Sequence, residues 1–211
     1  MHISDGILSA PVLVSGFVGT AAIAAVTLRN MDLEEIPKIS VITAIFFVAS
    51  LLKVPIGPTS IHLILSGLVG IVLGWRAFPA VLLGLILQAL LFGHGGVTVI
   101  GVNAIMLGGG ALASAFVWQQ RFRFKLKKPE LIFGAIAGAT GVIFSGIVLA
   151  GALMTAGEAF IGTAYYVLAV HIPIIIIEAA IVGIAAEFLH KVKPEILFAS
   201  TSSDSKPGSK E

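Results

Sequence analysis

The first two residues of the chain bring three nitrogen donors together. The sequence begins Met-His, so one metal ion can bind the α-amine of Met1 together with the backbone nitrogen and imidazole Nδ1 of His2. The amine and amide nitrogens close a five-membered ring, and the amide and imidazole close a six-membered ring. A fourth nitrogen completes a square, which favours Ni(II) or Cu(II) over the tetrahedral preference of Zn(II).

His62 is the candidate for the fourth nitrogen. It lies in the stretch VPIGPTSIHLILSG, in which turn-forming residues precede an apolar run. The turn is predicted at Pro55, Gly57 and Pro58. Thr59 or Ser60 is then expected to cap a helix that begins at about Ile61. A neutral imidazole of His62 there can ligate a metal, and the alternative is a hydrogen-bonded histidine in a capped helix.

Two further histidines and an asparagine are candidates for the surroundings of the metal. His94 lies in the glycine-rich stretch LLFGHGGVTVIGVN, which can fold back towards a helix bundle and ends with Asn103, a polar group that needs a partner. His94 is interpreted as a group that supports the ligands, as an alternative ligand or as a hydrogen-bonding group of the loop. His171 precedes Pro173, which frees backbone groups of a helix, so His171 has either a structural or a metal-binding role.

Glu178 and His190 have separate expected roles. Glu178 lies two helical turns beyond His171 on about the same face, where it can pair with a buried polar group or assist release. His190 precedes Lys191 and is expected at a membrane interface. A rival interpretation makes His94, His171 and Glu178 the site of an intramembrane metal-dependent hydrolase. The chain lacks both H-E-x-x-H and G-x-S-x-G, which disfavours that rival.

The composition indicates a polytopic membrane protein in which these residues are held by apolar helices. Of 211 residues, 57% are hydrophobic and 11% are charged, against about 25% charged in a soluble domain. This excludes a soluble enzyme, a disordered chain and a nucleic-acid-binding module. The chain has no cysteine, so it has no thiolate metal site, and it has no G-x-x-x-x-G-K-[ST] motif, so no ATP site is expected.

Seven apolar stretches predict about seven transmembrane helices, with six as the alternative. The stretches are approximately 7–28, 39–52, 61–74, 78–92, 101–118, 131–154 and 164–189. The second to fourth are short for full spans and need shelter by neighbouring helices. Gly67, Gly70 and Gly74, and also Gly134 and Gly138, are spaced for close helix packing.

The basic residues predict an outside N-terminus and a cytoplasmic C-terminus. Cytoplasmic loops collect Lys and Arg, and with seven spans this arrangement leaves only Lys53 outside. No basic residue precedes Arg29, so a cleaved signal peptide is not expected and Met1 should remain the mature terminus. Residues 1–197 are therefore predicted to form one membrane-embedded, metal-binding domain. Residues 198–211 are predicted to form a disordered polar cytoplasmic tail.

Four segments occur in an order that resembles a known family. They are MHISDGILS, GPTSIHL, QALLFGHGGVTVIGVNAIML and HIPIIIIEAAIVG, and the similarity covers roughly residues 1–190. The chain resembles the cobalt/nickel substrate-binding membrane component of energy-coupling-factor (ECF) transporters, the CbiM/NikM family. The resemblance implies metal ligation by Met1, His2 and His62. It also implies an ECF S-component-like helical bundle in the lipid bilayer with an added N-terminal helix.

The resemblance further implies capture of Ni(II) or Co(II) at the outer face of a prokaryotic cell membrane. Uptake is then driven by other chains: a transmembrane coupling (T) protein, cytoplasmic ATPases and, in many systems, a small accessory membrane protein. The chain itself is expected to be a transport subunit and not an enzyme. The alternative within transport is a stand-alone secondary metal carrier that works without an ATPase.

Overall fold

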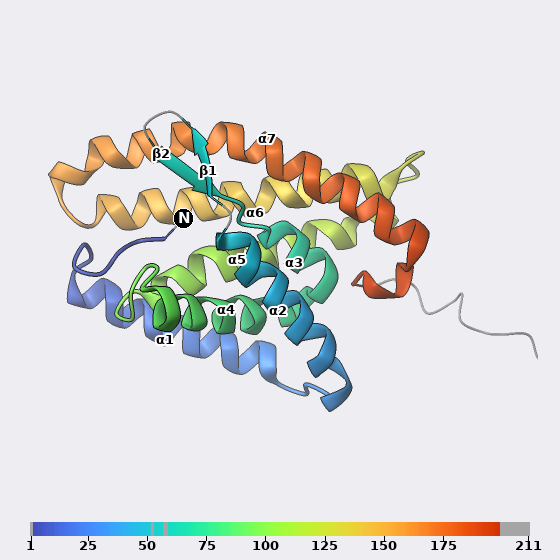
Figure 1. Cartoon of the computed structure of the whole chain (residues 1–211), viewed down its shortest axis with the longest axis horizontal. Helices are drawn as coiled ribbons and strands as arrows, with labels where there is room; N and C mark the ends of the chain where they lie inside the picture. The colour runs from blue at the N-terminus through green and yellow to red at the C-terminus, as the bar shows by residue number, and fades with distance from the viewer. Residues whose placement is uncertain (1, 52, 57–58, 199–211) are drawn as a thin grey trace, which may run out of the picture.

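The structure, a computed structural model, describes residues 2–51, 53–56 and 59–198, with the backbone alone for 53–56 and 59–62. These residues form a helical bundle with one short β-hairpin (Figure 1). The helices are α1 (Ala10–Leu28), α2 (Ile36–Leu51), α3 (Ser66–Leu73), α4 (Ala77–Phe92), α5 (Ile100–Gln119), α6 (Pro129–Met154) and α7 (Ile161–Val192). The predicted helical-bundle membrane fold is confirmed, and the short hairpin is an addition to the all-helical prediction.

The predicted count of seven spans is not confirmed. Five segments of the described chain are long and apolar enough to cross a membrane: Ala10–Leu28, Ser66–Phe92, Ile100–Arg123, Pro129–Met154 and Glu158–Val192. The third and fourth predicted stretches join into one segment, because α3 has only 8 residues and is linked to α4 by the 3-10 turn η2 (Gly74–Arg76). α2 has 16 residues and falls short of a span.

The segment that contains His62 is a strand, and the prediction that a helix begins at about Ile61 is wrong. β1 (Lys53–Ile56) pairs antiparallel with β2 (Thr59–His62), and His62 lies opposite Lys53 in the register. β-branched residues alternate through both strands and favour extended backbone over helix. The predicted N-caps Thr59 and Ser60 are therefore strand residues, and α3 begins only at Ser66.

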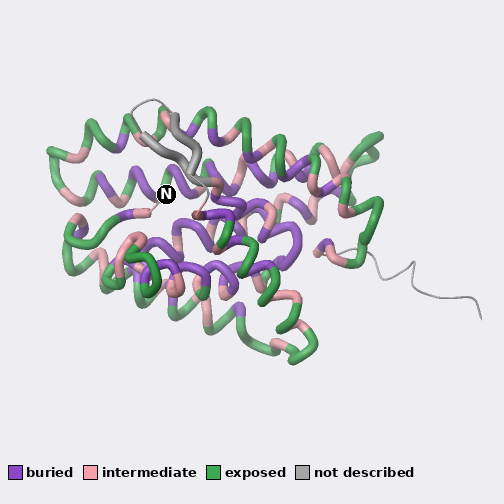
Figure 2. The backbone as a smooth tube through the Cα atoms, viewed as in Figure 1, coloured by how far each residue is buried: buried purple, intermediate pink, exposed green. Residues whose placement is uncertain are grey.

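Small residues allow α3, α5, α6 and α7 to pack closely around the core. Figure 2 shows α3 and the middle of α5 almost entirely buried, whereas α1 is mostly exposed. A Cβ atom on Gly67 would lie 2.6 Å from the Cα atom of Gly138 in α6, and one on Gly138 would lie 2.6 Å from the carbonyl oxygen of Glu178 in α7. The predicted role of these glycines in helix packing is confirmed at both positions.

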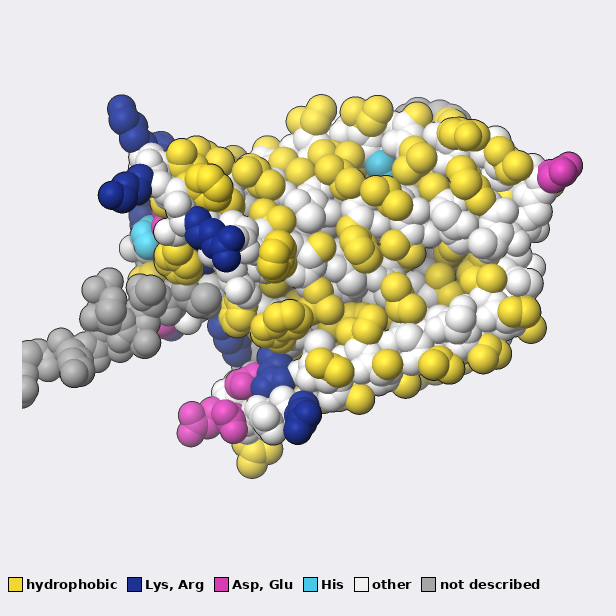
Figure 3. Space-filling view, turned by 180° about the vertical axis from the view of Figure 1, so that it is seen from behind, with side chains coloured by type: hydrophobic (Ala, Val, Ile, Leu, Met, Phe, Trp, Pro, Cys, Tyr) yellow, Lys and Arg dark blue, Asp and Glu magenta, His cyan; other side chains and the backbone are white. Residues whose placement is uncertain are grey.

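One end of the bundle collects the Lys and Arg side chains. Figure 3 shows them gathered at the left-hand end of the molecule, and the opposite end of that face has none among the residues coloured there. Arg76 fastens this basic end by donating to the carbonyl oxygens of Thr27 at 2.5 Å, Arg29 at 3.1 Å and Asn30 at 2.8 Å. It also forms an ion pair with Glu35 at 2.5 Å, so the ends of α1 and α3 and the start of α2 are held together.

Phe198, predicted as the first residue of the disordered tail, instead packs into the basic end. Its N–H donates to the Ile71 carbonyl oxygen at 2.8 Å, and its own carbonyl oxygen accepts from Trp118 Nε1 at 3.0 Å. Its ring covers Gly74, which has a φ of +57° and leaves no room for a side chain. The remainder of the predicted tail, residues 199–211, lies outside the described residues.

Candidate metal centre

The N-terminal segment is held inside the bundle by Asn103 of α5. The N–H of Ile3 donates to Asn103 Oδ1 at 3.0 Å, and Asn103 Nδ2 donates back to the Ile3 carbonyl oxygen at 3.1 Å. Both residues are 2% exposed, so the pair of bonds is shielded from solvent. One side-chain amide thus fixes the backbone immediately after His2, and Asn103 has the polar partner that its sequence position requires.

A second attachment joins Asp5 to the glycine-rich loop between α4 and α5. The Asp5 N–H donates to the Gly95 carbonyl oxygen at 2.9 Å, and the Asp5 carboxylate accepts from both the N–H and the hydroxyl of Thr98. Gly95 and Gly96 have φ values of +77° and +113°, a region that glycine adopts without strain. A Cβ atom on Gly96 would collide with the Asp5 carboxylate, so this close approach requires glycine.

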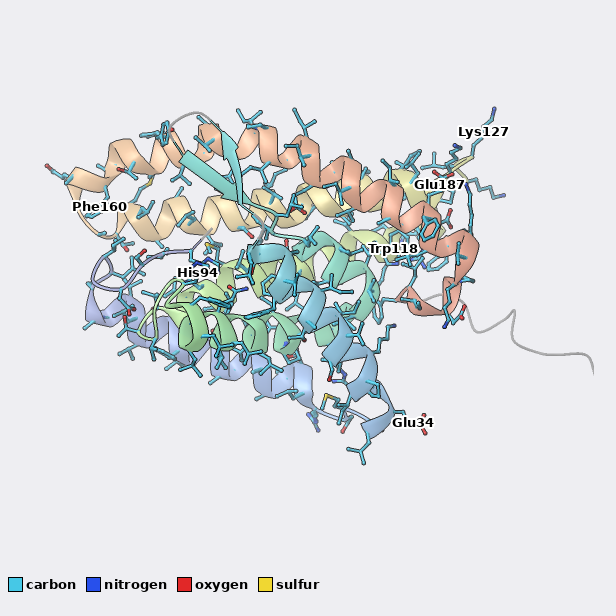
Figure 4. The ribbon with its side chains drawn as sticks, viewed as in Figure 1. Glu34, His94, Trp118, Lys127, Phe160 and Glu187 are labelled. Atoms are coloured by element: carbon cyan, nitrogen blue, oxygen red, sulfur yellow. The ribbon has the colours of Figure 1, made fainter. Side chains whose placement is uncertain are left out.

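His2 lies beside His94 as a result of these attachments. The two imidazole rings stack with centroids 6.4 Å apart and an interplanar angle of 19°, and His94 also contacts Phe92. Figure 4 shows His94 at the end of the bundle opposite Lys127 and Glu187. The structure therefore brings together His2, His94 and Asn103, three of the residues that the sequence nominates, at the end away from the basic cluster.

Gln88 of α4 contributes a neighbour of His2 that the sequence interpretation missed. Gln88 is fully buried, and its Nε2 donates to Ser50 Oγ at 2.7 Å. Its side chain also lies close enough to the His2 imidazole to raise the pKa of that group. The amide nitrogen is engaged with Ser50, and the carbonyl oxygen has no hydrogen-bond partner among the described residues, so it is the group available to accept a hydrogen bond. A lone glutamine in the apolar run AVLLGLILQALLF was the available signal.

Burial keeps the His2 imidazole neutral. The pKa of His2 is lowered to about 4, chiefly by loss of solvent and also by the nearby His94, while the neighbouring Gln88 side chain acts in the opposite direction. A neutral imidazole offers a lone pair to a metal without first losing a proton.

The stability of the metal-free chain should fall as the pH falls from about 6.5 to about 4. In that interval the unfolded chain protonates His2 whereas the folded chain does not, so acid favours unfolding. Melting temperatures measured across this range should decline more steeply for the native chain than for a His2→Gln chain. Parallel pH profiles for the two chains would contradict the burial of a neutral imidazole.

Glu178 of α7 positions the chain just after His62. Its Oε1 accepts from the N–H groups of Ile64 at 2.5 Å and Leu65 at 2.9 Å, and it is fully buried. The carboxylate also lies at the N-terminus of α3, where the helix dipole favours negative charge. Glu178 thus has a buried polar partner, as predicted, and that partner is the backbone that connects β2 to α3.

His171 and His190 lie apart from this group. His171 Nδ1 bonds to the Val167 carbonyl oxygen at 2.7 Å within α7, and its ring packs on Gly146 of α6. Within the described residues it has no hydrogen bond or ring contact with His2 or His94. His190 lies 3.7 Å from Glu130 at the basic end, consistent with its predicted interfacial place.

The predicted ligand set extends beyond the described residues. Met1 lies outside them, and so does the side chain of His62, whose backbone alone is described. The described part of the chain has no group of three or more His, Asp or Glu residues that could hold a metal ion. Ligation by Met1, His2 and His62 therefore stays a prediction.

Comparison with known protein families gives one match over nearly the whole chain. Residues 2–196 match the model of CbiM, described as the cobalt uptake substrate-specific transmembrane region. The match begins at His2 and includes α1 to α7 as well as the hairpin.

Individual relatives agree with this match. A putative metal transport protein of Haemophilus influenzae is 36% identical over 199 residues, which cover 93% of this chain and 97% of that protein. A fused nickel transport protein, NikMN, of Rhodobacter capsulatus is 34% identical over 111 residues, 50% of this chain and 32% of that protein. The crystal structure of a transition metal transporter has the same fold, with a TM-score of 0.76 at 23% identity, covering 91% of this chain and 93% of that one.

Proposed function

Because the chain belongs to the CbiM family of cobalt uptake substrate-specific transmembrane regions, we propose that it captures Ni(II) or Co(II) as the substrate-specificity (S) component of an ECF-type importer. It is a multi-pass membrane protein of a cobalt and nickel transport family. As an S component, this chain would capture the ion, and other chains would supply the energy for transport.

The docking of residues 2–5 into the bundle is the observation that supports capture at the N-terminus. Asn103 and Gly95 hold the backbone on either side of Ser4, so His2 has a fixed position beside Gln88 and His94. The proposed ligands are the Met1 amine, the backbone nitrogen and Nδ1 of His2, and the imidazole of His62. Planar nitrogen donors with a deprotonated amide favour Ni(II), and low-spin Co(II) fits the same square.

Partner chains complete the proposed importer. The relative named as a fused nickel transport protein is about three times longer than the part that aligns here, which supports an association with further transport polypeptides. We assign ATP hydrolysis to cytoplasmic ATPases, membrane coupling to a T protein and an auxiliary role to a small membrane protein. The basic end is assigned to the cytoplasm, which places His2 and His94 on the outer side.

Metal titration of the purified, metal-free chain tests capture. One Ni(II) or Co(II) per chain should bind without ATP or partner proteins, with the yellow absorption of a square-planar Ni(II)–nitrogen site. In liposomes the chain alone should not transport the ion, and uptake should need the partners and ATP. Uptake by the chain alone on an ion gradient would instead establish a secondary carrier, and failure to bind either ion would contradict the proposal.

Gln88→Leu should weaken metal binding without unfolding the bundle. We assign the Gln88 carbonyl oxygen, which is buried next to the His2 imidazole, to the N–H of His2 Nε2 in the metal-bound chain, which leaves Nδ1 free to ligate. Loss of a group that orients a ligand typically costs about 10- to 100-fold in affinity. Thr43→Val is the matched control, because it removes a buried polar group of α2 that bonds to the Ala80 carbonyl oxygen of α4 and not to Gln88. Equal affinities of the Gln88→Leu and native chains would remove Gln88 from the site.

A further inference from the structure

An amphipathic cavity opens at the basic end of the bundle, far from the metal centre. Its volume is about 480 Å³, and it lies between the end of α1, the start of α2 and the link from α3 to α4. One part of its lining is apolar, and the other part has three cations and one carboxylate. The apolar residues are Val26, Ile39, Val72, Leu73, Trp75 and Phe198, and the charged residues are Arg29, Glu35, Lys38 and Arg76.

Two of the three cationic side chains that line the cavity form no ion pair with a described carboxylate. Arg76 is committed to Glu35 and to three carbonyl oxygens. Lys38 is half-buried and Arg29 is exposed, and neither side chain forms an ion pair or hydrogen bond with any described residue. The cavity therefore has a net positive charge of two, because Glu35 neutralises one of three cations. Such a cavity repels a metal cation and attracts an anion.

The apolar wall shows what kind of anion fits. Trp75 is 59% exposed and Val26 is 71% exposed, although both border a cavity at the end of membrane-spanning helices. Tryptophan at such an end is typical of the level of the lipid headgroups. A small free anion would engage Arg29 and Lys38 but leave this wall uncovered. A molecule with an anionic head and an attached hydrocarbon chain satisfies both parts of the lining.

We propose that this cavity binds an anionic phospholipid of the adjacent leaflet, with the phosphate at Arg29 and Lys38 and the acyl region on Val26 and Trp75. Basic pockets between transmembrane helices are known to bind anionic headgroups through the same chemistry. The bound lipid would lie where α1, α2 and α3 meet, next to the bonds that Arg76 forms there. The proposal is independent of metal capture, since none of these residues contacts His2 or His94.

The test titrates the full chain in detergent with water-soluble dioctanoyl phosphatidylglycerol and with dioctanoyl phosphatidylcholine. The native chain should bind the phosphatidylglycerol at least about tenfold more tightly than the phosphatidylcholine. Each basic residue near an anionic headgroup adds appreciably to the binding free energy. An Arg29→Gln/Lys38→Gln chain should bind the two lipids equally. Arg76 is left intact because it holds the surrounding backbone.

An Arg123→Gln/Lys125→Gln chain is the matched control, since it removes two exposed cations from the same end of the bundle but outside the cavity. It should keep the native preference. Melting temperatures without lipid should agree among the three chains. Equal lipid preference in the native chain, or equal losses in both double variants, would overturn the proposal. Glycerol phosphate binding as tightly as the lipid would identify a free anion instead, and binding of polyglutamate but not of lipid would identify an acidic protein segment.

Discussion

A chain extended by Gly-Ser-Gly before Met1 should bind Ni(II) and Co(II) at least about 100-fold more weakly than the native chain. The extension turns the Met1 amine into a peptide nitrogen and moves the free amine three residues away, so the five-membered ring that includes the amine is lost. Removal of a ligand and of its chelate ring should exceed the 10- to 100-fold loss typical of a group that only orients a ligand. Absorption and equilibrium titration of both purified chains measure the difference.

The length of the extension matters for this comparison. A single added residue would place the free amine, two amides and the His2 imidazole in successive chelate rings, which is a new four-nitrogen square that needs no help from the bundle. Three added residues avoid that artefact. His190→Ala is the matched histidine control, because His190 lies at the basic end and should leave affinity unchanged. Undiminished binding by the extended chain would eliminate the N-terminal chelate and shift attention to His94 and His171.

The surroundings of His2 could be predicted in part because polar groups are rare in this sequence. The sequence predicts roles for His94 and Asn103 as polar residues in a glycine-rich stretch, and the structure places both beside the N-terminal segment. The partner of each group could not be predicted. Asn103 bonds to the backbone of Ile3, 100 residues away, and no local periodicity encodes a contact of that separation.

Elements with short or ambiguous patterns were harder to predict. Thr59–His62 precedes an apolar helix, and strand pairing with Lys53–Ile56 decides its conformation, a tertiary effect that overrides a capping signal. Phe198 adjoins a polar tail in sequence and is held by Ile71 and Trp118 of distant helices. Gln88 was overlooked because an apolar run surrounds it, although a fully buried amide in such a run needs polar partners.

Glu178→Leu should destabilise the chain and weaken its binding of metal. The substitution leaves the N–H groups of Ile64 and Leu65 buried without an acceptor, at a cost of about 1–3 kcal/mol for each. Two such groups cost about 2–6 kcal/mol together, so for a chain of this length the melting temperature should fall by roughly 4–24 °C. Affinity should fall as well, because these two residues follow the strand that ends at His62. Glu178→Gln keeps one carbonyl oxygen as an acceptor, so its melting temperature and metal affinity should lie between those of the native and Glu178→Leu chains.

Glu187 offers the matched control on the same helix. It lies two and a half turns further along α7 and pairs at the surface with Lys191 at 2.9 Å, so Glu187→Leu should leave the melting temperature almost unchanged. Affinity measured well below each melting temperature separates loss of fold from loss of the site. A Glu178→Leu chain with native stability and affinity would show that the carboxylate does not position the segment after His62. Native metal binding in Glu178→Gln, with the loss confined to Glu178→Leu, would show that the acceptor geometry matters and the negative charge does not.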